Sequence, residues 1–294
     1  MTAKRRILLQ LDTDPHPSVF DSVVACDAGV ELLLRHGNVE PAAVRDLVYG
    51  LMFTRGGADL RGSAIFVGGT DVAAADAVLT QVLETFFGPV RVSVMADPSG
   101  ANTTAAAAVV LASRHVELAE ARVAVLGATG PVGRRVARLL VHSGAQTCLA
   151  SRSLQRAAEV AQALGNGQTP DNASPCETSS PHQLDELLKK VDAVIAAGTP
   201  GICLLHQSQW QSAQLRLAID LNAVPPLGIE GIRADDRAVQ YGATVAYGAL
   251  GVGKTKMKIH KAAISRLFET NDRVYDVDAL FELARTMAAD DATV

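Results

Sequence analysis

The chain has 294 residues, of which 48% are hydrophobic and 20% charged, so it is long enough for about two globular domains and too apolar to be disordered. Its 27 Lys and Arg against 31 Asp and Glu give a net charge of −4, which does not favour nucleic acid as a partner. No stretch reaches about 18 apolar residues without a charge, so the sequence predicts no membrane span and no membrane partner.

The four cysteines are scattered along the chain, and no two of them form a C-x-x-C pair. This usage predicts neither a zinc site nor a disulfide framework. We therefore expect no metal, and we expect a soluble protein of the reducing cytoplasm.

Short apolar runs alternate with longer stretches of helical spacing, which predicts an α/β fold with parallel sheets. The first part of the chain is expected to hold strands at residues 7–11, 64–67 and 90–95, and helices at residues 19–34, 72–87 and 105–111. Asn102, Thr103 and Thr104 precede the last of these helices, where a side-chain oxygen can cap the free amides.

A second α/β unit is expected from about residue 119, as a domain over residues 119–252. Its expected strands are residues 122–126, 146–150, 193–197, 215–220 and 244–247, and its expected helices are residues 134–141, 154–164 and 183–190. The polar, proline-containing segment 165–181 is predicted to be a surface excursion. The helices expected at residues 255–268 and 278–287, with no strand between them, would form a third segment, 253–294, that packs back on the first domain, residues 1–118.

The strongest local motif is a glycine series between a strand and a helix. Gly127, Gly130 and Gly133 follow the strand at residues 122–126, and Thr129, Pro131 and Val132 complete the turn. Glycines at this place permit a tight turn and close approach of a pyrophosphate, while the free amides of the helix start favour negative charge. The motif predicts a Rossmann-type dinucleotide site; a tight turn without a ligand is the alternative.

The residues after the next strand bear on which dinucleotide is bound. An acid commonly contacts the ribose hydroxyls of NAD at this point, but here the chain has Ser151, Arg152, Ser153 and then Arg156. A guanidinium with flanking hydroxyls suits a 2′-phosphate. The sequence therefore favours NADP, with a merely solvated arginine as the alternative.

Two further strands end in residues that could line the ribose and nicotinamide pocket. Ala197 and Gly198 end one strand, and Asn222 follows another. Ligands of doubly wound sheets bind at the carboxyl ends of strands. Simple turn chemistry is the alternative at each position.

With these motifs placed, short segments spread over nearly the whole chain resemble the NADP-dependent methylene-tetrahydromethanopterin dehydrogenases of methylotrophic bacteria. They are residues 12–14, 17–21, 54–57, 65–69, 102–106, 129–133, 222–223, 225–229 and 248–260. The resemblance implies a substrate domain followed by a Rossmann domain, and a homo-oligomer. It also implies oxidation of methylene-tetrahydromethanopterin, or of methylene-tetrahydrofolate, to the methenyl form.

The resemblance also directs attention to polar residues that could orient a pterin. In the first part of the chain these are Asp14, Ser18, Asp21, Thr54, Arg55, Asp97, Asn102 and Thr103, to which His260 is added. Each could instead be a helix cap or a solvated loop residue. The resemblance further places Lys256 near the reacting ring, as the one catalytic candidate.

Two other functions remain open from the sequence. A shikimate-dehydrogenase-like oxidoreductase would share the glycine turn and the arginine after the second strand, but residues 37–115 contain no lysine to pair with an aspartate in proton transfer. A non-catalytic NADP sensor would bind the nucleotide without turnover. Nothing in the sequence separates methanopterin from folate carriers.

Overall fold

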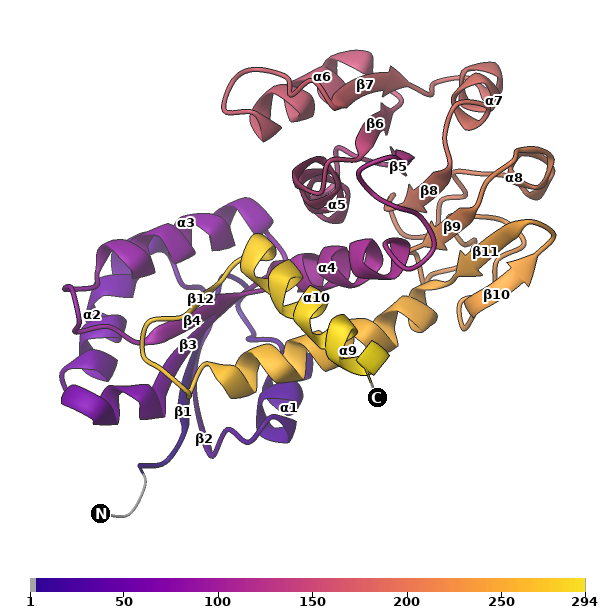
Figure 1. Cartoon of the computed structure of the whole chain (residues 1–294). Coiled ribbons are helices and arrows are strands. Elements are labelled where there is room, and N and C mark those ends of the chain that lie inside the picture. The colour runs from indigo at the N-terminus through magenta and orange to yellow at the C-terminus, as the bar shows by residue number, and fades with distance from the viewer. Residues whose placement is uncertain (1–3, 294) are drawn as a thin grey trace. The chain divides into compact units, whose positions relative to one another are not determined.

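The computed structural model describes residues 4–293, and the chain divides into two compact units. Unit 1 comprises Met1–Thr103 and Met257–Leu283, and unit 2 comprises Thr104–Lys256 and Ala284–Val294. Each unit contains a sheet flanked by helices (Figure 1). The predicted α/β fold with two sheet-containing parts is thereby confirmed.

Unit 1 is built on a five-stranded sheet in the order β12-β4-β3-β1-β2, with parallel neighbours throughout. Its strands are β1 (Ile7–Asp12), β2 (Leu32–His36), β3 (Ser63–Gly68), β4 (Ser93–Ala96) and β12 (Val274–Tyr275). Its helices are α1 (Val19–Asp27), α2 (Pro41–Met52) and α3 (Val72–Glu84), with short 3-10 turns η1 (Gly57–Gly62) and η2 (Pro98–Gly100). The strand order reverses between β1 and β3, which is where doubly wound sheets bind ligands.

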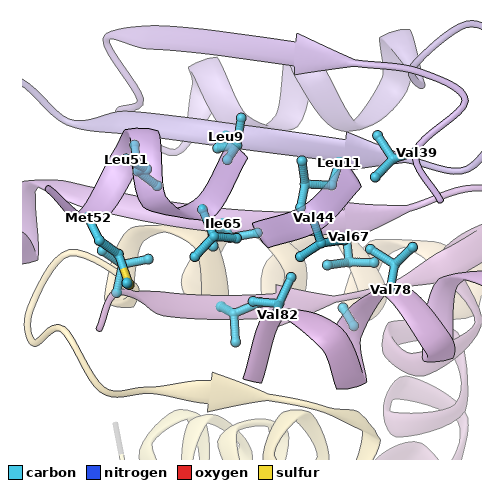
Figure 2. Packing of buried hydrophobic residues seen from close by; sticks show 14 of the residues in the cluster. Leu9, Leu11, Val39, Val44, Leu51, Met52, Ile65, Val67, Val78 and Val82 are labelled. Atoms are coloured by element: carbon cyan, nitrogen blue, oxygen red, sulfur yellow. The ribbon is translucent and has the colours of Figure 1, made fainter. Parts of the chain in front are cut away.

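Figure 2 shows the apolar core on one face of this sheet. Alternate residues of β1 and β3, Leu9 and Leu11 with Ile65 and Val67, point into it, as the period of two in a strand requires. Valines and other apolar residues four apart on α2, and again on α3, close the core from the helix side: Val44, Val48, Met52, Val78 and Val82. Full burial of each such side chain stabilises the fold by about 1.5–3 kcal/mol.

Unit 2 is built on a seven-stranded sheet in the order β10-β11-β9-β8-β5-β6-β7, parallel except for the β10–β11 pair. Its strands are β5 (Arg122–Leu126), β6 (Gln146–Ser151), β7 (Ala173–Glu177), β8 (Ala193–Ala196), β9 (Leu217–Asp220), β10 (Arg237–Tyr241) and β11 (Thr244–Tyr247). Its helices are α5 (Pro131–His142), α6 (Leu154–Leu164), α7 (Pro181–Leu188) and α8 (Gln207–Ser212). The order of the strands reverses between β5 and β8, as in dinucleotide-binding sheets.

Three long helices contain residues of both units. They are α4 (Ala101–Ala112), α9 (Ala249–Arg266) and α10 (Val277–Thr293). Because Met257–Leu283 belong to unit 1, the chain returns to the first part of the fold after completing the second sheet, whereas the second half of α10, from Ala284, belongs to unit 2. The boundaries of the compact units differ from those of the predicted functional domains 1–118, 119–252 and 253–294. The functional domains therefore stay predictions.

The single helix predicted for residues 19–34 is wrong in its second half. Helix α1 ends at Asp27, Gly29 adopts a φ of +90°, and residues Leu32–His36 form strand β2. A run of leucines fits a helix or a strand equally well by periodicity. Pairing of β2 with β1 decides for the strand.

Two further predictions fail at sheet edges. The segment 165–181 contains β7, the edge strand beside β6, and an edge strand tolerates Pro175, which lacks an N–H. The final helices do have a strand between them, because β12 pairs with β4 and the Val94 N–H donates to the Arg273 carbonyl at 2.8 Å. A strand of two residues is too short to show a period in the sequence.

Candidate functional site

The turn after β5 in unit 2 has the backbone geometry of an anion cradle. Gly127 has a φ of +76°, and a Cβ there would lie 2.8 Å from the Gly198 Cα. A Cβ on Gly133 would lie 2.3 Å from the Gly127 carbonyl oxygen. Neither position therefore accepts a side chain, so the chain can turn tightly from β5 into α5.

The start of α5 leaves amides available to a ligand. Gly130 is the N-cap residue and supplies no side-chain cap, and Pro131 is the first residue of the helix. Backbone N–H groups in the first turn of an uncapped helix are a ready-made site for phosphate. The cradle and the uncapped helix thus fit the pyrophosphate of a dinucleotide, with Thr129 and Val132 in the same turn.

The predicted 2′-phosphate residues lie just beyond the carboxyl end of β6. Arg152 and Arg156 are exposed, whereas the hydroxyls of Ser151 and Ser153 accept hydrogen bonds from backbone N–H groups. The Ser151 Oγ accepts the Ser153 N–H at 3.2 Å, and the Ser153 Oγ caps α6 by accepting the Arg156 N–H at 3.4 Å. The arginines can reach a ligand, while the serine hydroxyls are already partly engaged.

Ala197, Gly198 and Asn222 follow β8 and β9 at the same edge of the sheet as the glycine turn. The Asn222 side chain braces its own loop: its Oδ1 accepts the Val224 N–H at 2.9 Å and its Nδ2 donates to the Pro226 carbonyl at 3.1 Å. Beside it lies Asp220, a buried acid that the sequence reasoning missed. An acid at the carboxyl end of an apolar strand is the signal that could have found it.

In unit 1, a cluster of polar and ionisable side chains forms beyond the carboxyl end of β4. The carboxylate of Asp97 is fully buried and accepts the Asn102 N–H at 2.9 Å, the Thr103 N–H at 3.0 Å and the Thr103 Oγ1–H at 2.5 Å. The His260 Nδ1 lies 3.7 Å from the Asp97 Oδ2, and the His260 Nε2 lies 3.9 Å from the Asp21 Oδ1. Asp21, Asp97, Asn102, Thr103 and His260, all predicted from the sequence, are brought together here.

Two aromatic rings flank this cluster. The buried ring of Phe66, in β3, stacks on His260 with centroids 5.7 Å apart and an interplanar angle of 10°. Phe20, in α1, lies 6.4 Å from His260 and is 52% exposed. Both rings lie in segments that carry the family resemblance, 17–21 and 65–69, but neither was predicted as a site residue, because a single aromatic residue beside apolar neighbours resembles ordinary core.

The prediction that Asn102 and Thr103 cap the helix that follows them is wrong. Both residues lie in the first turn of α4, and the carboxylate of Asp97 accepts their N–H groups instead. The Asn102 Nδ2 donates to the Ala96 carbonyl at 2.6 Å. Asp97 therefore both accepts the free N–H groups at the start of α4 and lies next to His260.

Asp14 and Ser18 lie just after the end of β1, and both already form hydrogen bonds within unit 1. The Asp14 carboxylate accepts the N–H and the hydroxyl of Thr70, the latter at 2.8 Å. Ser18 caps α1 by accepting the Asp21 N–H, while the buried Asp12 accepts the Ser18 N–H at 3.0 Å. Ser18 thus sets the start of the helix that carries Asp21.

Thr54 and Arg55 are not brought to this cluster. Thr54 ends α2 by donating to the Leu51 carbonyl at 3.1 Å, and Arg55 donates to the Arg5 carbonyl, next to the start of β1, at 3.0 Å. They lie at the amino edge of the sheet of unit 1, whereas Asp97 follows the carboxyl end of β4. Lys256 lies four residues before His260 in α9, a spacing that puts both on one helix face.

Comparisons with known proteins agree with this division of the chain. The family model described as methylene-tetrahydromethanopterin dehydrogenase, N-terminal, matches residues 19–99. The family model described as shikimate/quinate 5-dehydrogenase matches residues 110–230. The first match covers most of the unit 1 sheet, and the second covers the glycine turn.

Solved structures of low sequence identity share the fold. The ligand-free 5-ketofructose reductase of Gluconobacter sp. strain CHM43 is 13% identical, with a TM-score of 0.51 over 97% of this chain and 99% of that one. A chorismate mutase/shikimate 5-dehydrogenase fusion protein from Clostridium acetobutylicum is 12% identical, with a TM-score of 0.51 over 98% of each chain. These likenesses bear on architecture alone.

Two curated relatives from Methylorubrum extorquens match almost end to end. The "Bifunctional protein MdtA" is 42% identical over 97% of this chain and 99% of its own length. An "NAD(P)-dependent methylenetetrahydromethanopterin dehydrogenase" is 30% identical over 91% of this chain and 93% of its own length. On these matches, together with the N-terminal family model, the chain belongs to the methylenetetrahydromethanopterin dehydrogenase family.

Proposed function

We infer that the chain is an NAD(P)-dependent oxidoreductase that removes a hydride from methylene-tetrahydromethanopterin and gives the methenyl form, in one-carbon metabolism. Its family, and the name of the relative that is 30% identical, support this activity. The observation that carries the proposal is the buried Asp97–His260 pair with Asp21 beside it, in the unit that the pterin-dehydrogenase model matches.

The chemistry asks for stabilisation of positive charge. Hydride loss from a carbon between two nitrogens leaves an amidinium-like cation, and no proton has to move. Asp21 and Asp97 place two carboxylates within 4 Å of the His260 ring. Fixed charge aimed at the place where opposite charge develops stabilises a transition state, and removal of one such preorganised group, a donor to an oxyanion, costs about 10²- to 10³-fold in rate.

Orientation accounts for the rest of the rate. Well-oriented contacts can supply about 7–11 kcal/mol of a barrier. The ring of Phe20, half exposed beside His260, offers an apolar face for a flat pterin ring, and Asp14 and Ser18 would supply polar edges. Asn102 and Thr103 are buried and would act by holding Asp97 in place. Thr54 and Arg55, at the amino edge of the sheet, take no part in this proposed site. The place of Lys256 near the reacting ring stays a prediction.

The dinucleotide supplies the hydride acceptor when it is bound. We propose that the amides of the first turn of α5 hold its pyrophosphate, at the turn formed by Gly127, Gly130 and Gly133, and that Arg152 and Arg156 contact a 2′-phosphate, so that NADP is preferred. Ala197, Gly198 and Asn222 would border the ribose and nicotinamide. No metal takes part in the proposal; among residues 4–290, no three His, Cys, Asp or Glu side chains group as metal ligands.

Residues 1–118 would then form the substrate domain, residues 119–252 the NADP domain, and residues 253–294 the returning helices. A homo-oligomer in the cytoplasm is the proposed state. Within residues 4–293, no helix is long and apolar enough to cross a membrane.

The deciding experiment is NADPH formation by the purified protein. Methylene-tetrahydromethanopterin and methylene-tetrahydrofolate are each supplied with NADP and with NAD. We expect turnover with the methanopterin substrate and NADP, and the folate arm ranks the two carriers. Tight NADP binding without turnover of either carrier would contradict the proposal and favour a nucleotide sensor.

A further inference from the structure

Asp220, the last residue of β9, is a buried carboxylate with only backbone partners among its described hydrogen bonds. It is 1% exposed. Its Oδ1 accepts the Asn222 N–H at 3.0 Å, and its Oδ2 accepts the Ile229 N–H at 2.9 Å. Burial raises the pKa of this carboxyl, and the backbone hydrogen bonds that it accepts oppose that rise. A buried carboxylate that accepts two backbone amides holds those parts of the backbone in a set geometry.

The backbone that it holds is the loop 222–229, which Asp220 closes at both ends. The contact with Gly228 is tight, since a Cβ there would lie 2.6 Å from the Asp220 Oδ1. Inside the loop, the Asn222 side chain bridges Val224 and Pro226. Removing the carboxylate would therefore leave the buried N–H groups of Asn222 and Ile229 without their acceptor, which destabilises this arrangement of the loop.

The same loop is tied to the neighbouring loop after β8. The Gly228 carbonyl accepts the N–H groups of Leu204 at 2.8 Å and Leu205 at 3.1 Å. Leu204 in turn packs against Gly198, where a Cβ would lie 2.5 Å from the Leu204 Cδ1. Gly198 is the backbone that approaches Gly127. A continuous series of contacts thus leads from Asp220 to the glycine turn.

The position of these loops in the sheet indicates which half of a dinucleotide they would border. A doubly wound sheet consists of two mononucleotide-binding halves that meet where the strand order reverses. Here β5, β6 and β7 form the half that carries Arg152, and β8 and β9 begin the other half. With the adenosine phosphate assigned to the Arg152 side, the loops after β8 and β9 border the nicotinamide.

We propose that Asp220 is a positioning residue that fixes loops 198–205 and 222–229 against the glycine turn and so sets the orientation of the nicotinamide ring. The proposal rests on the function proposed above for the dinucleotide-binding unit. Asp220 would act through Gly228 and Asn222 and not touch the substrate.

The first test is hydrogen exchange in the protein without ligand, on Asp220→Asn. The asparagine keeps the size of the side chain, but its amide group turns a donor toward backbone donors. We expect exchange at least about tenfold faster in segments 198–205 and 222–229, because the loss of about 1.4 kcal/mol corresponds to a factor of ten. Asp192→Asn is the matched control: the Asp192 Oδ2 accepts the Arg122 N–H at 2.8 Å, but at the amino end of β8. It should leave both loops unchanged.

The second test is kinetic. For Asp220→Asn we expect kcat to fall about tenfold to hundredfold, since a small misplacement can cost about 10²-fold, with the KM for NADP changed less than threefold and the NADP over NAD preference kept. Leu215→Ala, at a buried residue just before β9, provides a variant destabilised without a change at the loops. Its kcat should stay near the wild-type value.

Each outcome decides between the proposals. If Asp220→Asn exchanges like the wild type, or if Leu215→Ala shows the same loss of kcat, Asp220 has no positioning role. If NADP added to the wild type protects neither loop from exchange, the loops do not face the cofactor and the inference fails. A wild type that turns over no pterin overturns the proposed function, while NADP protection that is lost in Asp220→Asn would still uphold the inference about Asp220.

Discussion

Asp97 shows how one residue can serve both the fold and the site. Its carboxylate accepts two backbone amides and one hydroxyl from the start of α4, and the same group lies 3.7 Å from His260. Hydrogen bonds to a charged group contribute about 1.5–3 kcal/mol each. Substitution of Asp97 would therefore mix loss of stability with loss of function, so the charge of the site is better tested at its neighbour.

Asp21→Asn tests that charge with little structural cost. Asp21 lies in the first turn of α1, where loss of its charge costs about 0.3–1 kcal/mol in stability. We expect kcat to fall about tenfold to hundredfold, because less negative charge faces the developing cation. Steady-state kinetics with the pterin substrate measures this. Asp27→Asn, at the other end of α1 and paired with Lys261 at 2.7 Å, should turn over normally; an equal loss there would exclude a local effect of Asp21.

Arg152→Asp tests the cofactor preference. We expect the KM for NADP to rise about tenfold to hundredfold, since a charge-assisted contact to phosphate contributes about 1.5–3 kcal/mol, while the KM for NAD is spared. Parallel titrations of NADP and NAD measure the change. Arg237→Asp, on the exposed strand β10, serves as the charge control. An unchanged preference in Arg152→Asp would refute the assignment.

At the scale of elements, buried acids at the ends of strands organise the turns of both sheets. Asp12 receives the Ser18 N–H after β1, Asp97 starts α4 after β4, and Asp220 closes the loop after β9. Charged acceptors form stronger bonds than neutral ones. The loops at the carboxyl edges, where ligands bind, are thereby held in place.

A buried acid, Asp236, also lies in the turn before β10. Its hydrogen bond with Tyr241 leads to a prediction about how stability depends on pH. The Tyr241 hydroxyl donates to the Asp236 Oδ2 at 2.6 Å, and this bond raises the pKa of Tyr241 to about 12. A raised tyrosine pKa stabilises the fold fully below the pKa of about 10 in the unfolded chain, and this contribution is lost as the pH rises toward 12.

Tyr241→Phe should therefore lower the free energy of unfolding by about 1–3 kcal/mol at pH 7. The difference from the wild type should shrink when the pH rises above about 10, where the unfolded tyrosine ionises. Urea unfolding at pH 7, 9 and 11 measures both statements. A difference independent of pH would show that packing, and not the bond to Asp236, accounts for the loss. Tyr49→Phe, in unit 1, is the control without this acceptor.

At the scale of the whole molecule, the chain forms two sheets with separate cores. The core drawn in Figure 2 belongs to β1, β3, α2 and α3, and the core of the second sheet contains Trp210, the one tryptophan of the sequence. The two clusters share no residue. Tryptophan fluorescence therefore reports on unit 2, whereas far-ultraviolet circular dichroism reports on both units.

Leu11→Ala uses this difference. Leu11 is fully buried in the unit 1 core, and such truncations cost about 2–5 kcal/mol. We expect a lower midpoint of urea unfolding by circular dichroism and a smaller change by tryptophan fluorescence. The mirror variant, Leu149→Ala in β6, should shift the fluorescence midpoint. Equal shifts of both probes in both variants would mean that the chain unfolds as one cooperative unit.

The sequence by itself determined the α/β class, most helices, the glycine turn and the family. These features depend on local periodicity and on turn chemistry within a few residues, which any single stretch of chain carries. The sequence did not predict three strands: residues 32–36, the edge strand β7 and the two-residue strand β12. Their own residues fit other structures as well, and pairing with a strand distant in the sequence determines that they are strands.

For the candidate site too, the sequence supplied individual residues and the tertiary structure supplied their arrangement. Asp21, Asp97 and His260 could each be named from the sequence, but only the fold brings the three together from α1, the end of β4 and α9. It also leaves Thr54 and Arg55 at the other edge of the sheet and adds Phe66 and Asp220. Side chains far apart in the sequence meet only when sheets and helices pack, so their joint chemistry belongs to the tertiary structure.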